Sequence, residues 1–279
     1  MEENKYFSVP ALSKSQIKYW DSHNPSKFWD ICTFNPNRKK VEPNDAMVQG
    51  QLYHAFLWER DKVLDMFEVH DDLGKMRSNK KWTEAQKNCA KTIITTDELN
   101  HGTRLVDALL KHQVIRDLID SGTNEKEYFW NDKVWGIDCK AKLDCIKNTT
   151  EGIYVIDYKS TSQMDKMQFI DKGGFQYDVG FYARAVMAKY GLPLVKFFFI
   201  FQSTKDGEEN DIRIKVVEGA HLEACAIATD CAVREIVPKI KEYLAKPEEK
   251  IWLPDIKPEP FEISPWYDRE MANKINKGE

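Results

Sequence analysis

Hydrophobic positions in the first 120 residues recur at the spacing of an amphipathic helix. Ser13 followed by Gln16 matches a capping box, so a helix is expected to begin directly after Ser13. Apolar residues then return every three or four positions in several later stretches. They predict helices over residues 46–63, 83–95 and 104–120. The first part of the chain is therefore expected to be mainly helical.

The period changes to two from residue 125 onward. The stretch "EKEYFWNDKVWGIDCKAKLDCI" predicts two strands joined near Asn131 and Asp132. Further strands are expected over residues 153–159, 194–204 and 211–218, with helices over residues 175–189 and 222–244. This order predicts an α/β domain with a central mixed β-sheet flanked by helices. We expect one domain over residues 1–246 and a proline-rich tail over residues 247–279.

Composition narrows the class of protein. The chain has 279 residues, of which 42% are hydrophobic and 31% charged, values typical of a globular protein. A net charge of −4 argues against wholesale non-specific binding to nucleic acid but permits a local basic cleft. The first residues are acidic and polar, unlike a signal peptide, and no apolar run is long enough to span a bilayer. The six cysteines form no C-x-x-C pair, so we expect reduced thiols in a cytoplasmic protein.

The candidate chemistry begins in "GIYVIDYKST", a hydrophobic stretch that ends with Asp157 and Lys159. Residues two apart on a strand share a face, so both side chains can reach the same cleft. If the preceding strand pairs with this one, Asp144 and Asp157 converge, and Mg²⁺ is the usual counter-ion for two close carboxylates. Taken alone, a D-x-K at a strand end is better explained as an exposed end, with Asp144 paired to a lysine on its own strand.

Two further positions add candidate ligands. Glu125 and Glu127 fall on the same side of the incoming strand, and either can supply another carboxylate. Gly50 and His54 are one turn apart on the second predicted helix, so a small residue leaves room beside the imidazole. A lone histidine on such a helix is more often a core or surface residue than a ligand.

Taken in order, these motifs resemble the PD-(D/E)xK nuclease superfamily. Within it the likeness is greatest to the RecE-type exonucleases, which include exonuclease VIII and its phage relatives. The matching features are Gly50-x-x-x-His54, "EKEYFW", "GIDCKAKLD", "DYKST" and "FQYDVGFYARA", and the likeness covers about Leu12 to Lys189. Two positions depart from the pattern: Leu143 replaces the proline that names the superfamily, and Asp178 lies four residues before Tyr182, where relatives commonly carry glutamine.

The resemblance implies roles for individual residues. Lys159 would act on the water nucleophile, beside the catalytic carboxylates Glu125, Asp144 and Asp157. One or two Mg²⁺ ions, or Mn²⁺ as a substitute, would be held by His54, Glu125, Asp144, Asp157 and the backbone carbonyl of Tyr158. DNA contacts would come from Lys140, Lys142, Gln176 and Tyr182.

The resemblance also implies an activity and partners. It implies hydrolysis of linear double-stranded DNA from its ends, 5′ to 3′, by a ring-shaped homo-oligomer that supplies single strands to an annealing protein in recombination. Three alternatives remain open from the sequence. They are a RecB-like or Cas4-like repair endonuclease, a non-catalytic DNA-binding or protein-interaction module on the same fold, and an unrelated α/β domain.

Overall fold

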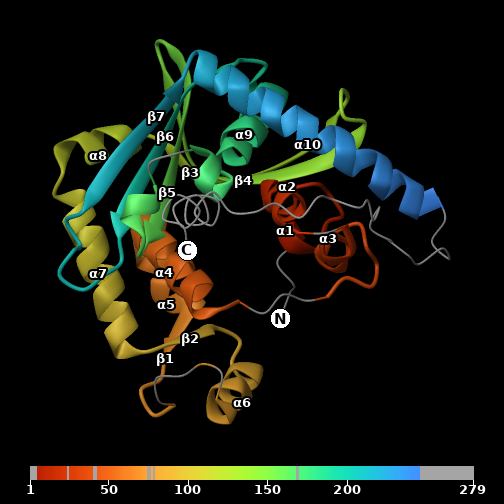
Figure 1. Ribbon diagram of the computed structural model, residues 1–279. Helices are drawn as coiled ribbons and strands as arrows, with labels where there is room; N and C mark the ends of the chain where they lie inside the picture. The colour runs from red at the N-terminus through yellow and green to blue at the C-terminus, as the bar shows by residue number, and fades with distance from the viewer. Residues whose placement is uncertain are drawn as a thin grey trace, which may run out of the picture.

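The computed structural model describes residues 5–23, 25–39, 43–73, 77, 79–167 and 170–245, and it has a five-stranded mixed sheet at its centre (Figure 1). The sheet order is β3-β4-β5-β6-β7, in which β5 and β6 are parallel and the other neighbours antiparallel. The strands are β3 (Thr123–Asp132), β4 (Ile137–Thr149), β5 (Gly152–Thr161), β6 (Leu194–Ser203) and β7 (Ile212–Glu218). The predicted central mixed sheet is confirmed.

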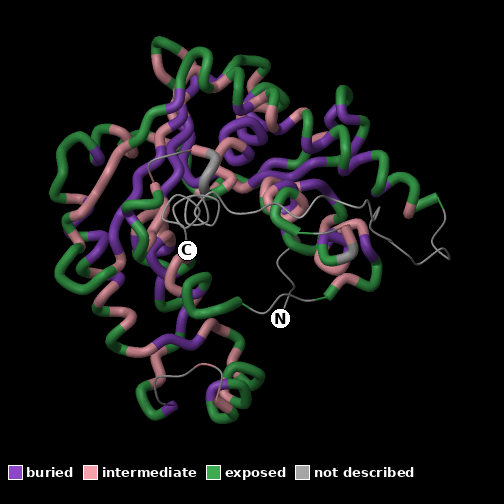
Figure 2. The backbone as a smooth tube through the Cα atoms, in the orientation of Figure 1, coloured by how far each residue is buried: buried purple, intermediate pink, exposed green. Residues whose placement is uncertain are grey.

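Helices cover both faces of the sheet. One face packs against α2 (Lys14–Ser22), α3 (Pro25–Ile31), α9 (Phe175–Tyr190) and α10 (Ala220–Ala245). The other packs against α4 (Asp45–Trp58), α7 (Thr96–Leu110) and α8 (Gln113–Ile119). Alternation along β5 sends Val155 into the first core and Ile156 into the second. Figure 2 shows the buried residues concentrated along the strands between these two layers.

The helical prediction needs two corrections. The expected helix over residues 83–95 is instead α6 (Lys80–Asn88) followed by β2 (Thr92–Ile94), because three successive β-branched residues favour extended backbone. The expected helix over residues 104–120 is two helices, α7 and α8, which are separated at Lys111 and His112. β2 pairs in parallel with β1 (Phe67–Val69) in a separate two-stranded sheet. The remaining short elements are α1 (Lys5–Ser8), η1 (Arg60–Lys62), α5 (Val63–Met66), η2 (Met164–Lys166) and η3 (Ile170–Gly173).

Side-chain hydrogen bonds define the start of α2 and the turn between β3 and β4. The predicted start of α2 is confirmed, and the Gln16 side chain accepts a hydrogen bond from the backbone N–H of Ser13 at 2.9 Å. The turn between β3 and β4 lies slightly later than predicted. There the Asp132 carboxylate accepts from the backbone N–H groups of Val134 and Trp135, and Gly136 takes a φ of 63°.

Strands β4 and β5 separate before the end of β5, and this separation shapes the rest of the molecule. Their last paired residues are Cys145 and Ile156, after which β5 continues beside β6 alone. The edge of β4 that β5 leaves is taken by Leu12, which donates to the Asp138 carbonyl and accepts from the Lys140 N–H, both at 2.8 Å. The start of α2 is thereby anchored beside the point of separation.

Among the described residues, no helix is both long and apolar enough to cross a membrane. The proline-rich tail expected over residues 247–279 lies outside the described residues, and the single domain over residues 1–246 stays a prediction.

Gly180 controls how closely α9 approaches α10. A Cβ at this position would lie 2.1 Å from the Thr229 hydroxyl and 2.4 Å from the Cys225 carbonyl oxygen. We expect Gly180→Ala to lower the free energy of unfolding in urea by about 1–3 kcal/mol, since a packed interface must move. Gly50→Ala in α4 is the matched control, because a Cβ there meets nothing within 4 Å. The control should be neutral or stabilising by about 0.5–1 kcal/mol; equal losses in both variants would contradict the assigned contact.

Candidate functional site

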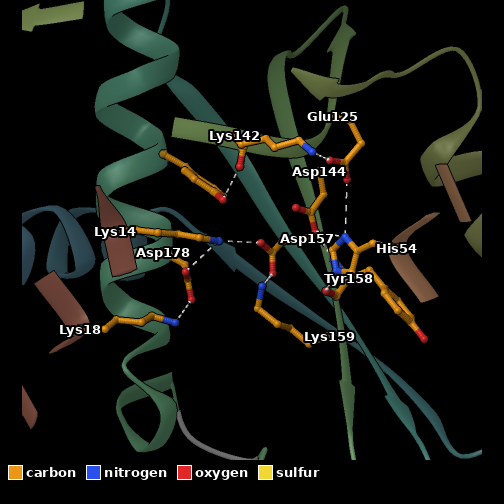
Figure 3. Close-up of polar contacts among 11 residues, drawn as sticks. Lys14, Lys18, His54, Glu125, Lys142, Asp144, Asp157, Tyr158, Lys159 and Asp178 are labelled. Carbon is orange, nitrogen blue, oxygen red and sulfur yellow. Dashed lines mark hydrogen bonds and ion pairs between the residues drawn. The ribbon is translucent and has the colours of Figure 1, made fainter. Parts of the chain in front are cut away.

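Two acidic side chains lie where β4 and β5 separate, as shown in Figure 3. Asp144 on β4 is 8% exposed, and Asp157 on β5 is fully buried. The two strands are linked here through a side chain, since the Asp144 carboxylate accepts the backbone N–H of Tyr158 at 3.1 Å. Burial and the nearby charge of Asp157 raise the pKa of Asp144. The predicted convergence of the two carboxylates is therefore present in the structure.

Asp157 is flanked by two lysines, one on each carboxylate oxygen. Lys159 from the same strand contacts Oδ2, and Lys14 from α2 lies 3.3 Å from Oδ1 (Figure 3). Burial alone would raise the pKa of Asp157, but the two ammonium groups outweigh burial and hold the pKa well below its usual range. Asp157 is thus an ionised carboxylate in a buried position.

Glu125 joins this group from β3. It lies opposite Asp144, because its two neighbours on β3 pair with the two neighbours of Asp144 on β4. Its φ of 50° is uncommon for a residue with a Cβ, and such backbone strain gathers at functional sites. Burial would raise the pKa of Glu125, but His54 and Lys142 together lower it. Glu127 is exposed, and the structure brings Glu125 rather than Glu127 beside Asp144.

Glu125, Asp144 and Asp157 together are called the carboxylate cluster. His54 reaches this cluster from α4, which covers the face of the sheet opposite to α2 and α9. Its Nε2 donates to the Tyr158 carbonyl at 3.1 Å, which turns Nδ1 toward Glu125 and Asp144 at 3.6 Å each. Burial alone would lower the pKa of His54, but the charges of Asp144 and Glu125 outweigh burial, and the pKa is raised. A hydrogen bond from one ring nitrogen orients the other nitrogen, as in many metal-binding histidines.

The carboxylate cluster, His54 and the lysines that pair with the cluster are called the centre below. Its donor atoms suit a divalent metal ion. One ligand atom each from His54, Glu125 and Asp144 lie within 4.8 Å of one another. Carboxylate oxygens are the preferred ligands of Mg²⁺, and an added imidazole suits Mn²⁺ as well. The Tyr158 carbonyl keeps a second lone pair besides the one that accepts from His54. The residues present therefore fit such an ion without rearrangement of the strands.

A second layer of charges lies behind Asp157, and of its members the sequence analysis named only Asp178. Asp178 on α9 is fully buried and pairs with Lys18 and with Lys14, the latter at 3.1 Å. The Lys14 ammonium also lies 4.3 Å from the ring centroid of Tyr182. Lys14 and Lys18 are four residues apart, so their spacing was the one available signal that both face the same way from α2.

The residues expected to contact DNA divide into two groups. Lys142 lies in the centre, where its ammonium pairs with Glu125. Gln176 is half-buried at the start of α9 and makes no described contact with the centre. The expectation is wrong for Lys140 and Tyr182, which the structure uses in packing.

Lys140 is 2% exposed, and its ammonium donates to the carbonyls of Tyr6, Phe7 and Val9. Those three bonds use all three ammonium hydrogens, so none is left for a phosphate. Tyr182 is 1% exposed, and its hydroxyl donates to the Lys142 carbonyl at 2.7 Å. Tyr182 thus supports Lys142 and Lys14, whereas Lys140 holds the segment of the chain that precedes α2.

A second group of possible ligands consists of His101 in the first half of α7 and Asp206 and Glu209 in the β6–β7 turn. Arg104 already pairs with both of its carboxylates. This group is therefore a surface ion-pair network, and the chemistry belongs to the carboxylate cluster.

Comparison with known structures supports the fold. A crystal structure from Eubacterium rectale, described as a "Putative exonuclease", matches with a TM-score of 0.62 and 14% sequence identity, over 94% of this chain and 96% of that chain. A structure described as SSO0001 matches with a TM-score of 0.29 and 14% identity, over 67% of this chain and 88% of that chain. No curated protein sequence matches the chain.

One family model matches residues 13–248, a span that holds the whole sheet, the carboxylate cluster and the lysines of α2. It is described as a PDDEXK-like domain of unknown function (DUF3799). The predicted likeness to the PD-(D/E)xK superfamily is confirmed, and the chain belongs to this family of PDDEXK-like domains.

Proposed function

We propose that this protein is a metal-dependent nuclease that hydrolyses phosphodiester bonds of DNA and acts on the ends of linear duplexes. The observation that carries the proposal is the group formed by His54, Glu125 and Asp144, whose ligand atoms lie within 4.8 Å of one another. Asp157 lies beside this group and pairs with Lys159. Membership of a PDDEXK-like family supports a nuclease. The description of the Eubacterium rectale protein supports an exonuclease over an endonuclease.

We assign the metal ligands to His54, Glu125, Asp144, Asp157 and the Tyr158 carbonyl, with Mg²⁺ as the preferred ion and Mn²⁺ as a substitute. When bound, the ion supplies charge stabilisation at the phosphate and a water of lowered pKa. The chain's own contribution is to fix these donors from three different strands and α4, so that little reorganisation accompanies the reaction.

Lys159 is the residue that we assign to the water nucleophile. Its side chain is 25% exposed and is held by Asp157, two positions earlier on the same face of β5. An ammonium in this position can orient a water molecule and stabilise the negative charge that develops on the phosphate. Lys142, held by Glu125 at 39% exposure, is available to contact the DNA backbone.

The finer details of the activity follow from the RecE-type resemblance. We propose 5′ to 3′ degradation of one strand, a ring-shaped homo-oligomer around the DNA, and delivery of the remaining strand to an annealing protein in recombination. We also place the protein in the cytoplasm, where its six cysteines stay reduced.

Degradation of end-labelled DNA tests the reaction itself. With Mg²⁺ we expect loss of a linear duplex, release of a 5′ label before a 3′ label, and no cutting of a covalently closed circle; EDTA should abolish the loss. Cutting of the circle would favour the endonuclease alternative. Binding of DNA without cleavage, in Mg²⁺ and in Mn²⁺, would favour the non-catalytic module.

Paired substitutions test the ligand assignment. Asp157→Asn should lower cleavage by roughly 100-fold or more, a loss typical of removing a charge-stabilising contact in the transition state. Its thermal unfolding should remain cooperative, because the flanking lysines are partly exposed and can be solvated.

The matched control compares two glutamates two residues apart on β3. Glu125→Gln should cripple cleavage, whereas Glu127→Gln, on an exposed side chain, should leave it within about twofold. The opposite ranking of the two variants would move the ligand to Glu127, and full activity of Asp157→Asn would refute the assigned centre.

A further inference from the structure

Lys14 enters the reaction centre from a distant part of the chain. It precedes Asp157 by 143 residues, yet its ammonium lies 3.3 Å from the Asp157 carboxylate (Figure 3). The same ammonium lies 3.1 Å from Asp178 and 4.3 Å from the ring centroid of Tyr182. Among the described residues, Lys14 and Lys159 are the two lysines that reach Asp157, and they take opposite oxygens of the same carboxylate.

Hydrogen bonds fix the backbone on the N-terminal side of Lys14. Leu12 forms two hydrogen bonds with β4, one through its N–H and one through its carbonyl. The capping box at Ser13 fixes the first turn of α2. The flexible side chain of a lysine loses rotamer entropy when it is ordered. Here that ordering is already supplied by two carboxylates and an aromatic ring, so no further ordering is needed when a substrate arrives.

The charges around Lys14 leave room for an anion. The fully buried carboxylate of Asp178 pairs with both Lys14 and Lys18. These three side chains together therefore carry one more positive charge than negative. Asp157 carries one negative charge and also serves Lys159. Lys14 donates a hydrogen bond to Asp157 and forms an ion pair with Asp178, so these carboxylates engage at most two of its three ammonium hydrogens, and its side chain is 23% exposed. The third hydrogen can reach an acceptor that approaches Asp157 from solvent.

We propose that Lys14 is a second catalytic lysine, whose ammonium binds a non-bridging oxygen of the phosphate being cleaved, on the opposite side of Asp157 from Lys159. The proposal rests on the nuclease function proposed above and extends it. Asp178 and Tyr182 are positioning residues for Lys14, which gives a structural reason for an aspartate four residues before Tyr182 on α9. Lys18 contributes only through Asp178.

Lys14→Met is the test variant, because methionine keeps an unbranched stem over Tyr182 and removes the charge. Lys18→Met is the matched control from one helical turn later, on the same carboxylate. We expect Lys14→Met to reduce the cleavage rate at saturating DNA by roughly 100-fold, Lys14→Arg to recover part of this loss, and Lys18→Met to change the rate by less than about fivefold.

A second measurement separates phosphate binding from support of Asp157. Mn²⁺ binding without DNA, followed by electron paramagnetic resonance, should be unchanged or tighter in Lys14→Met, because a cation beside Asp157 has been removed. Weaker Mn²⁺ binding in proportion to the lost rate would overturn the proposal and leave Lys14 a structural support. Wild-type cleavage in the same assay tells the two hypotheses apart. An active wild type with a fully active Lys14→Met overturns the role of Lys14 alone, and a wild type inactive with both metals overturns the proposed function as well.

Discussion

The fully buried carboxylate of Asp157 is the constraint on which the structure depends. An ionised group out of water is costly unless cations and hydrogen-bond donors surround it. Here Lys159 and Lys14 supply that compensation from β5 and from α2. Because α2 must therefore lie against the sheet, the N-terminal segment becomes part of the central fold, and its docking and the ionisation of Asp157 support each other.

The separation of β4 from β5 turns ordinary sheet bonding into a site. Where the ladder stops, the backbone groups of Tyr158 find side-chain partners, since its N–H goes to Asp144 and its carbonyl to His54. The freed edge of β4 is satisfied by Leu12. Buried backbone groups need partners, so the same hydrogen bonds that repair the interrupted sheet also orient the carboxylate and the imidazole. Asp144 and His54 therefore stabilise the sheet as well as forming the centre.

Sequence alone predicted the parts that local chemistry decides. Alternation placed β4 and β5 and brought Asp144 to Asp157, and the capping box placed the start of α2. Prediction from sequence failed for residues whose contacts come from distant segments of the chain. Lys140 was expected to contact DNA, but its ammonium binds carbonyls more than 130 residues away in sequence. The role of Lys14 was invisible for the same reason, because only the folded chain brings α2 to β5.

The balance of charge in the centre explains how a mildly acidic protein can process DNA. Glu125, Asp157 and Asp178 each pair with at least one lysine, whereas Asp144 contacts a backbone amide and His54 among the described residues. A metal ion alone would add positive charge to a centre already close to neutral, and a phosphate alone would face the carboxylates. The two together add little net charge, because the positive ion and the negative phosphate offset each other. The centre is therefore most complementary to a metal ion and a phosphate at once, and this condition is met by the substrate and cofactor of phosphodiester hydrolysis, whatever the net charge of the surrounding surface.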